Sequence, residues 1–134
     1  MIYYIPDVTH STDDPKEGLV WLVQQEQNAK KVVIFSNEEV IKTVFKSLGF
    51  VDDVINGIIK GKRIAVSQDL AVPVATLSDG IPADFEYALV FYPSRDVLDT
   101  LSNVKGVKDI LVIPWAEDDI QYLQSVGQVF KGSF

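Results

Sequence analysis

The sequence predicts an α/β fold in which a mostly parallel sheet of about five strands lies between two layers of helices. Short apolar runs alternate along the chain with stretches in which apolar residues recur every three or four positions, as in alternating strands and helices. Within the runs the apolar residues are consecutive, as in KVVIFS at residues 31–36, which is typical of parallel strands covered on both faces. With 134 residues, 47% of them hydrophobic, residues 1–134 are expected to form a single domain.

Five of the apolar runs are predicted to be strands. They are Met1–Ile5, Lys31–Ser36, Arg63–Ser67, Tyr87–Tyr92 and Asp109–Pro114. Two helix starts are marked by residues that cap helices: Asp14, which precedes Pro15, and Ser36, which has Glu39 three residues later. Apolar stripes predict further helical stretches within 40–48, 51–59, 97–104 and 120–126.

The order of these elements is β-α-β-α-α-β-loop-β-α-β-α. Strands joined by helices must be parallel, with right-handed crossovers, so we expect a three-layer α/β/α sandwich of the Rossmann-like or flavodoxin-like kind. The segment Gln68–Glu86 is too long for an ordinary connection. Pro73 and the turn signal at 78–80 are compatible either with an extra strand at Val74–Leu77 or with a lid-like loop, and the sequence leaves this choice open.

Composition excludes several classes of function. The chain has no Cys and one His, so disulfides, thiolate metal sites and sites that need two imidazoles are excluded. The 12 Lys and Arg against 19 Asp and Glu give a net charge of −7, and direct binding of nucleic acid is not expected. No apolar run could cross a membrane and no signal peptide is recognised, so a soluble, cytoplasmic protein without membrane contact is expected.

Motifs that would identify a cofactor or a reaction are missing from the sequence. There is no G-x-G-x-x-G after a strand, no phosphate-binding P-loop and no G-x-S-x-G nucleophile elbow. No cofactor is therefore predicted, and a non-catalytic protein is favoured over an enzyme.

The carboxyl ends of the strands are the predicted place for a ligand, because open parallel sheets bind ligands beyond that edge. This edge is expected to bring together Asp7 and His10 after the first strand, Asn37 after the second and Arg95 after the fourth. Arg95 would hold a carboxylate or phosphate bidentately. His10 would exchange a proton near neutral pH.

Structural roles compete with these functional ones. Ser36, Ser94 and Asp14 are expected to cap helices, Arg95 to pair with Asp96 or Asp99, and Trp115 to lie at the rim of the core. A divalent cation between Asp7 and Asp69 is chemically reasonable, but carboxylate spacing alone does not define such a site, and no metal is predicted.

The ordered pattern of segments resembles the second RecA-like domain of helicases. Residues 18–49 are similar to its opening helix, strand and helix, and GKRIAVSQ at 61–68, DGIP at 79–82 and ALVFYP at 88–93 are similar to its later strand, turn and strand. The resemblance implies a degenerate RecA-like fold. It does not imply ATP hydrolysis, because the family's terminal motif needs a Gln and paired Arg residues, and no Arg follows Arg95.

Three functions remain open. The favoured one is a non-catalytic interaction or regulatory domain. The second is a protein or enzyme that binds a small anionic ligand at the carboxyl edge, and the third is an accessory of nucleic-acid machinery that acts through protein contacts. The segment Gln128–Phe134 carries Phe130 and Phe134, which are expected to dock on the chain's own core or, alternatively, on a second copy in a homo-oligomer.

Overall fold

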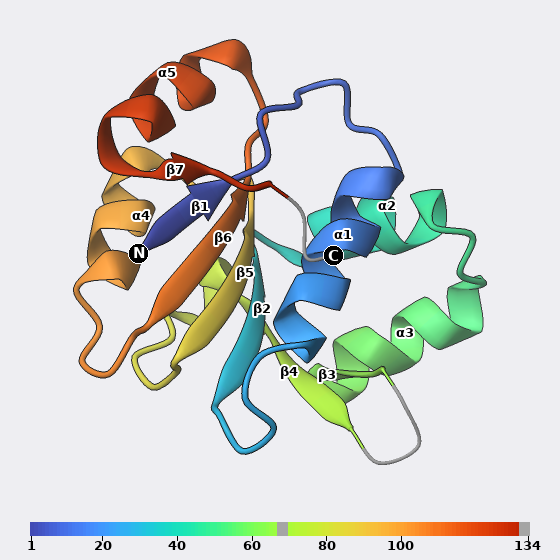
Figure 1. Cartoon of the computed structure of the whole chain (residues 1–134). Coiled ribbons are helices and arrows are strands. Elements are labelled where there is room, and N and C mark those ends of the chain that lie inside the picture. The colour runs from blue at the N-terminus through green and yellow to red at the C-terminus, as the bar shows by residue number, and fades with distance from the viewer. Residues whose placement is uncertain (67–69, 132–134) are drawn as a thin grey trace.

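Seven strands form one sheet in the computed structural model, which describes residues 1–66 and 70–131 (Figure 1). The strands are β1 (Ile2–Tyr4), β2 (Lys31–Phe35), β3 (Arg63–Ala65), β4 (Ala71–Thr76), β5 (Tyr87–Phe91), β6 (Asp109–Ile113) and β7 (Gln128–Val129). Their order across the sheet is β3-β4-β2-β5-β6-β1-β7. All neighbouring strands are parallel except β3 and β4, which are antiparallel.

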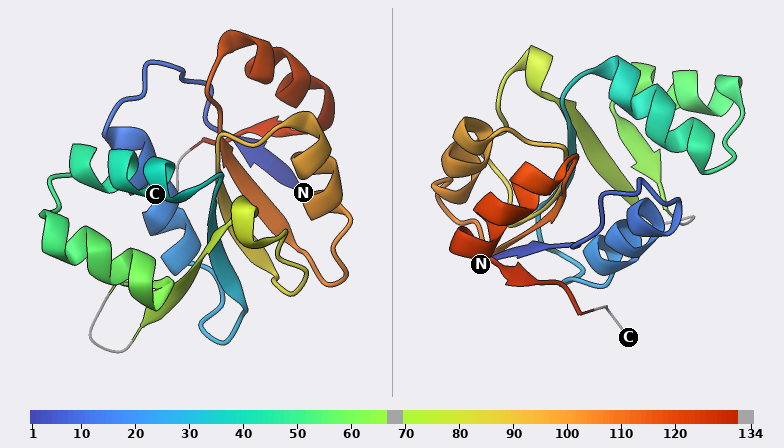
Figure 2. Two further views of the ribbon diagram at one scale, coloured as in Figure 1. Left: turned by 180° about the vertical axis from the view of Figure 1, so that it is seen from behind. Right: turned by 90° about the horizontal axis from the view of Figure 1, so that it is seen from above.

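Helices cover both faces of the sheet, as Figures 1 and 2 show. One face is covered by α1 (Asp13–Val23), α2 (Glu38–Ser47) and α3 (Asp52–Gly61), and the other by α4 (Arg95–Ser102) and α5 (Glu117–Val126). A short 3-10 helix, η1 (Leu77–Asp79), follows β4. The predicted three-layer α/β/α sandwich with a mostly parallel sheet is confirmed. None of the described helices is long and apolar enough to cross a membrane.

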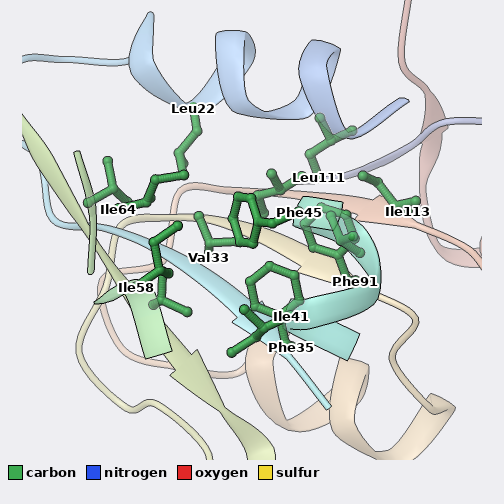
Figure 3. Packing of buried hydrophobic residues seen from close by; sticks show 14 of the residues in the cluster. Leu22, Val33, Phe35, Ile41, Phe45, Ile58, Ile64, Phe91, Leu111 and Ile113 are labelled. Carbon is green, nitrogen blue, oxygen red and sulfur yellow. The ribbon is translucent and has the colours of Figure 1, made fainter. Parts of the chain in front are cut away.

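The central strands are buried on both faces, as their consecutive apolar residues predicted. Every residue of β2 and β5 is buried, and so is each residue of β6 after Asp109. On the face shown in Figure 3, side chains of α1, α2 and α3 pack on the inward residues of these strands. The rings of Phe35 and Phe91 stack there, with centroids 4.7 Å apart and planes within 9°.

The sheet has two more strands than expected, and one predicted strand runs the other way. The undecided segment after residue 68 contains β4, which takes the place beside β2 that parallel crossovers would have given to Arg63–Ser67. Only five residues separate Ala65 from Ala71 in the sequence, too few for a parallel crossover, and β3 pairs with β4 in the antiparallel direction. The Ser67 end of the predicted strand lies outside the described residues.

The seventh strand, β7, pairs with β1 near the C-terminal end of the described chain. The amide of Phe130 donates to the carbonyl of Tyr4 at 2.8 Å, and the Phe130 ring packs against the core. The expectation that Phe130 docks on its own chain is confirmed. Phe134 lies outside the described residues, and the homo-oligomer stays a prediction.

Two predicted helix caps are wrong and one is correct. The helix α1 begins at Asp13, so Asp14 lies inside its first turn and is no cap. At the start of α2 the cap is Asn37, whose extended backbone lets Oδ1 accept from the Val40 amide at 3.1 Å, and not Ser36. Ser94 caps α4 as predicted and accepts from the Val97 amide at 3.3 Å.

Candidate functional site

A cleft of about 120 Å³ lies at the carboxyl edge of the sheet. The chain leaves β2 for α2 on one face of the sheet and leaves the neighbouring β5 for α4 on the opposite face (Figure 1). Such a change of direction opens a crevice in α/β sheets. The cleft is lined by Asp7, His10 and Ser11 between β1 and α1, by Asp14 and Pro15 in the first turn of α1, by Thr43, Val44 and Ser47 of α2, and by Tyr92, Ile113, Pro114 and Trp115 at the ends of β5 and β6.

Three aromatic rings form one wall of the cleft. The ring centroids of His10 and Trp115 are 4.1 Å apart, and the Tyr92 ring meets Trp115 edge-on at 5.0 Å. The backbones of His10 (φ 57°) and Tyr92 (φ 56°) are both left-handed, a conformation that costs about 1–3 kcal/mol for such residues and is concentrated at functional sites. The indole of Trp115 remains 55% exposed.

The imidazole of His10 is oriented by a hydrogen bond between its Nε2 and the carbonyl oxygen of Trp115, at 2.8 Å. A carbonyl can only accept, so Nε2 carries the hydrogen, and in the neutral ring Nδ1 is an acceptor. The carboxylate of Asp119 in turn accepts from the Trp115 amide at 3.2 Å and fixes the backbone that orients His10. His10 therefore presents an acceptor from a fixed position.

Asp7 is held as a carboxylate. Its Oδ1 accepts from the amide of Thr9 at 2.9 Å and from the hydroxyl of Thr9 at 2.8 Å. The backbone hydrogen bond from Thr9, followed by a side-chain hydrogen bond with Asp14, lowers the pKa of Asp7 below its usual value.

Asp14 is buried because α1 lies directly against the sheet. Gly18 permits this approach, since a Cβ at that position would lie only 2.6 Å from a methyl carbon of Leu89 in β5. The first turn of α1 is thereby pressed into the fold, and the Asp14 side chain is only 7% exposed. Among the described residues, no group donates a hydrogen bond to its Oδ2 atom.

Burial, together with the neighbouring Asp7, raises the pKa of Asp14 to about 7. Below pH 7 Asp14 is therefore mostly protonated while Asp7 is ionised, and the Asp14 hydroxyl donates to the Asp7 carboxylate. When Asp14 ionises, its buried oxygen has no donor. The site can accept hydrogen bonds, and among the described residues that line it there is no Lys or Arg to neutralise it.

A larger hollow of about 380 Å³ lies near the end of β4, between α2 and the segment after η1. Three of its polar groups are paired with one another: the Thr76 hydroxyl donates to Asp79 at 2.9 Å, and Lys62 lies 3.7 Å from the same carboxylate. Because these groups are already paired, the hollow has fewer free polar groups to bind a ligand than its volume suggests.

The structure brings together two of the four residues predicted to form a site. Asp7 and His10 both line the cleft, whereas Asn37 and Arg95 do not. Asn37 caps α2, and the guanidinium of Arg95 lies over the ring of Tyr122, 4.9 Å from its centroid. Asp69, the second carboxylate of the hypothetical cation site, lies outside the described residues.

Sequence reasoning gave another role to two residues of the cleft, Asp14 and Trp115, and missed Tyr92. Asp14 was interpreted as a cap, although Pro15 and Gly18 beside it are a signal that the first helical turn could be buried. Trp115 was placed at the core rim, but its indole is largely exposed. Nothing in the sequence marks the left-handed backbone of Tyr92, which is neither glycine nor asparagine.

The fold and cleft together define a parallel α/β protein with a carboxyl-rich crevice beyond its strand ends. In the described part of the chain, no three side chains of His, Asp or Glu are grouped as metal ligands would be. Comparisons with protein-family models, with curated proteins and with solved structures found no match for this chain. The RecA-like resemblance therefore stays a prediction.

Proposed function

We propose that the protein binds a small molecule in the cleft at the carboxyl edge of its sheet. The observation that carries this proposal is the Asp14 carboxyl group, which lines the cleft, is 7% exposed and has no hydrogen-bond donor at Oδ2. Burying such a group without a partner costs roughly 1–3 kcal/mol, and more when it is charged. A ligand that supplies the donor recovers that free energy, so the cleft is favoured as a binding site.

The backbone around the cleft supports the same proposal. The two left-handed aromatic residues, His10 and Tyr92, lie with their ring centroids 5.7 Å apart beside Asp14. Strain of this kind persists where the surrounding structure fixes it and is concentrated at ligand sites. The raised pKa of the Asp14 carboxyl group follows from the same burial, and carboxyl groups perturbed in this way are typical of functional sites.

A binding protein of this kind agrees with the non-catalytic regulatory domain that the sequence favours. The ligand would contact the segment between β1 and α1 and the segment between β6 and α5, which are joined by the hydrogen bond from His10 to Trp115. Binding of the ligand in the cleft would then change a surface to which another protein can bind. The accessory role in nucleic-acid machinery stays a prediction with no observation in its favour.

A fragment screen by ¹H–¹⁵N NMR tests the proposal. The screen contains cationic, neutral and anionic fragments of about one aromatic ring each. We expect saturable shifts of the backbone amides of His10, Asp14 and Tyr92 and of the Trp115 indole. If no fragment shifts these signals, or if every fragment that binds shifts the residues around the larger hollow instead, the proposal is wrong.

Two variants sharpen this screen. Trp115→Ala removes the exposed ring from the wall of the cleft and should weaken binding about tenfold, since stacking on an aromatic ring contributes on the order of 1 kcal/mol. Ile81→Ala removes an exposed apolar side chain from the larger hollow and should leave the affinity unchanged. Equal loss in both variants would point to a general effect on the fold.

A further inference from the structure

We infer that the ligand of this cleft is an organic cation that carries N–H donors, such as an amidinium or a primary ammonium group. This inference rests on the proposed function and specifies its ligand. It replaces the anion of the alternative, small-ligand prediction, because the guanidinium that was to anchor an anion stacks on Tyr122 in a separate pocket between α4 and α5.

The charges that face the cleft have one sign. Asp13 and Glu17 of α1 add their negative potential at Asp14 to that of Asp7. From β5 the neutral phenol of Tyr92 faces the same carboxyl, and the residues of α2 that line the cleft contribute hydroxyl and apolar groups. His10 is the one basic group among the described lining residues. An anion would be repelled there, whereas a cation would be attracted.

The hydrogen-bond acceptors of the cleft suit the N–H donors of such a ligand, and the aromatic wall suits its positive charge. Oδ2 of Asp14, the carboxylate of Asp7 and Nδ1 of His10 can each accept an N–H donor. The exposed Trp115 indole offers its face to a positive charge, a contact worth about 0.5–2 kcal/mol. The cleft of about 120 Å³ is near the size of an engineered cavity that holds benzene, roughly 150 Å³, so a single planar head group fits.

Binding of the cation exchanges one positive charge for another. With the cleft empty below pH 7, the proton of Asp14 bridges the two carboxyl groups. An N–H donor of the ligand takes the place of this proton, which passes to the solvent, so one proton is released for each cation bound. The affinity should therefore rise with pH until Asp14 is ionised without the ligand.

Three probes with the same ring separate charge from shape: benzamidine, benzamide and benzoate. We expect benzamidine to bind in the cleft, benzamide to bind at least tenfold more weakly and benzoate not to bind. Between pH 8 and pH 5.5 the dissociation constant of benzamidine should rise about 30-fold, as expected for competition with one proton at a group that titrates near pH 7. Calorimetry in buffers of different ionisation enthalpy counts the released proton.

A pair of variants provides the control. Asp14→Asn keeps the shape of the carboxyl but cannot ionise, so it should weaken benzamidine binding at least tenfold at pH 8 and remove the part of the pH dependence that comes from Asp14. Asp53→Asn makes the same change of charge in the first turn of α3, at an exposed position outside the cleft lining, and should preserve both. Equal binding of benzamidine to the parent and Asp14→Asn would overturn the inference.

The outcomes also separate this inference from the proposed function. If benzamide or benzoate shifts the cleft signals as strongly as benzamidine, the cation class is wrong while the binding site stands. If benzamidine gives no shift in the cleft at about 10 mM, the cation class is again wrong. In that case the broader fragment screen decides whether the cleft binds ligands at all.

Discussion

Opposite charges are buried to the same degree at the two ends of α1, but among the described residues only one of them has hydrogen-bond partners for all of its buried polar atoms. Asp14 in the first turn and Lys31, whose amine reaches the last turn, are each 7% exposed. The Lys31 Nζ donates to the carbonyl of Val23 at 3.3 Å and to that of Gln25 at 3.0 Å, which closes the carboxyl end of the helix. Asp14 has no such donor at its Oδ2 among the described residues.

The same contrast extends to the two edges of the sheet. At the amino edge, near Lys31, charged groups are paired: Lys108 lies 3.2 Å from Glu26 and 3.3 Å from Glu86, and Lys30 lies 2.9 Å from Asp84. The carboxyl edge instead has a buried acid without a donor. A buried acid without a donor at one edge, and paired charges at the other, agree with the proposal that the carboxyl edge binds a ligand while the amino edge contributes stability.

The largest expected effect is on the pH dependence of stability. The pKa of Asp14 is about 7 in the folded protein and 3.8 in the unfolded chain, so the stabilisation from its proton is complete below pH 3.8 and is lost as pH rises through 7. The free energy of unfolding should fall by up to about 4 kcal/mol over this range. Asp14→Asn should remove this fall and be more stable than the parent at pH 8.

Urea denaturation at pH 5 and pH 8 measures this effect, with Asp53→Asn as the matched control. Asp53→Asn should show the same fall in stability as the parent between the two pH values, because Asp53 is exposed in the first turn of α3 and is not one of the charges that act on Asp14. A parent whose stability is the same at pH 5 and pH 8 would show that Asp14 is an ordinary acid and that the two ends of α1 are alike.

Removing the partnered charge of Lys31 should lower the stability, whereas removing the charge of Asp14 should raise it. Lys31→Met keeps most of the stem and loses the two hydrogen bonds to the end of α1, so we expect a loss of about 2 kcal/mol at pH 7. Lys16→Met on the exposed side of α1 should change stability by less than about 0.5 kcal/mol. Chemical denaturation compares the two, and a stabilised Lys31→Met variant would contradict the contrast.

A smaller effect is expected at the start of α2, where a cap is present that α1 lacks. Asn37→Ala should cost about 1 kcal/mol, because the Val40 amide loses its acceptor. Ser36→Ala should leave the melting temperature nearly unchanged. Thermal melts of the two variants distinguish them, and the reverse order would restore Ser36 as the cap.

The smallest effect is expected at Arg95. Its guanidinium stacks on Tyr122 at the surface, so Arg95→Ala should cost less than about 1 kcal/mol. The variant should bind benzamidine like the parent. Loss of ligand binding in Arg95→Ala, with stability retained, would return Arg95 to the site.

Much of the fold could be predicted from the sequence because burial on both faces leaves a plain record in consecutive apolar residues. The runs at β2, β5 and β6 are of this kind, and the helices between them follow from apolar stripes. The antiparallel pair of β3 and β4 has no such unbroken run of consecutive apolar residues. Residues of β4 alternate between buried and exposed, and Pro73 lies within it, so its pattern is that of an edge region and not of a central strand.

The sequence predicted the location of the candidate site, but only two of the four residues predicted to form it line the cleft. Strand ends located Asp7 and His10, because topology alone brings those positions to the carboxyl edge. Asp14 was missed because its burial depends on the close approach of Gly18 to Leu89, a tertiary contact that local spacing does not encode. Arg95 was included because it follows β5, but the direction of a long side chain is decided by what it can stack on.

The most direct test of this account is the titration of the Asp14 carboxyl carbon, followed by ¹³C NMR from about pH 3 to pH 9. We expect a midpoint near 7 for Asp14 and one below the usual aspartate value for Asp7. Benzamidine should move the Asp14 midpoint downward, because the cation stabilises the carboxylate. A midpoint near 4 for Asp14 in the free protein would contradict the account.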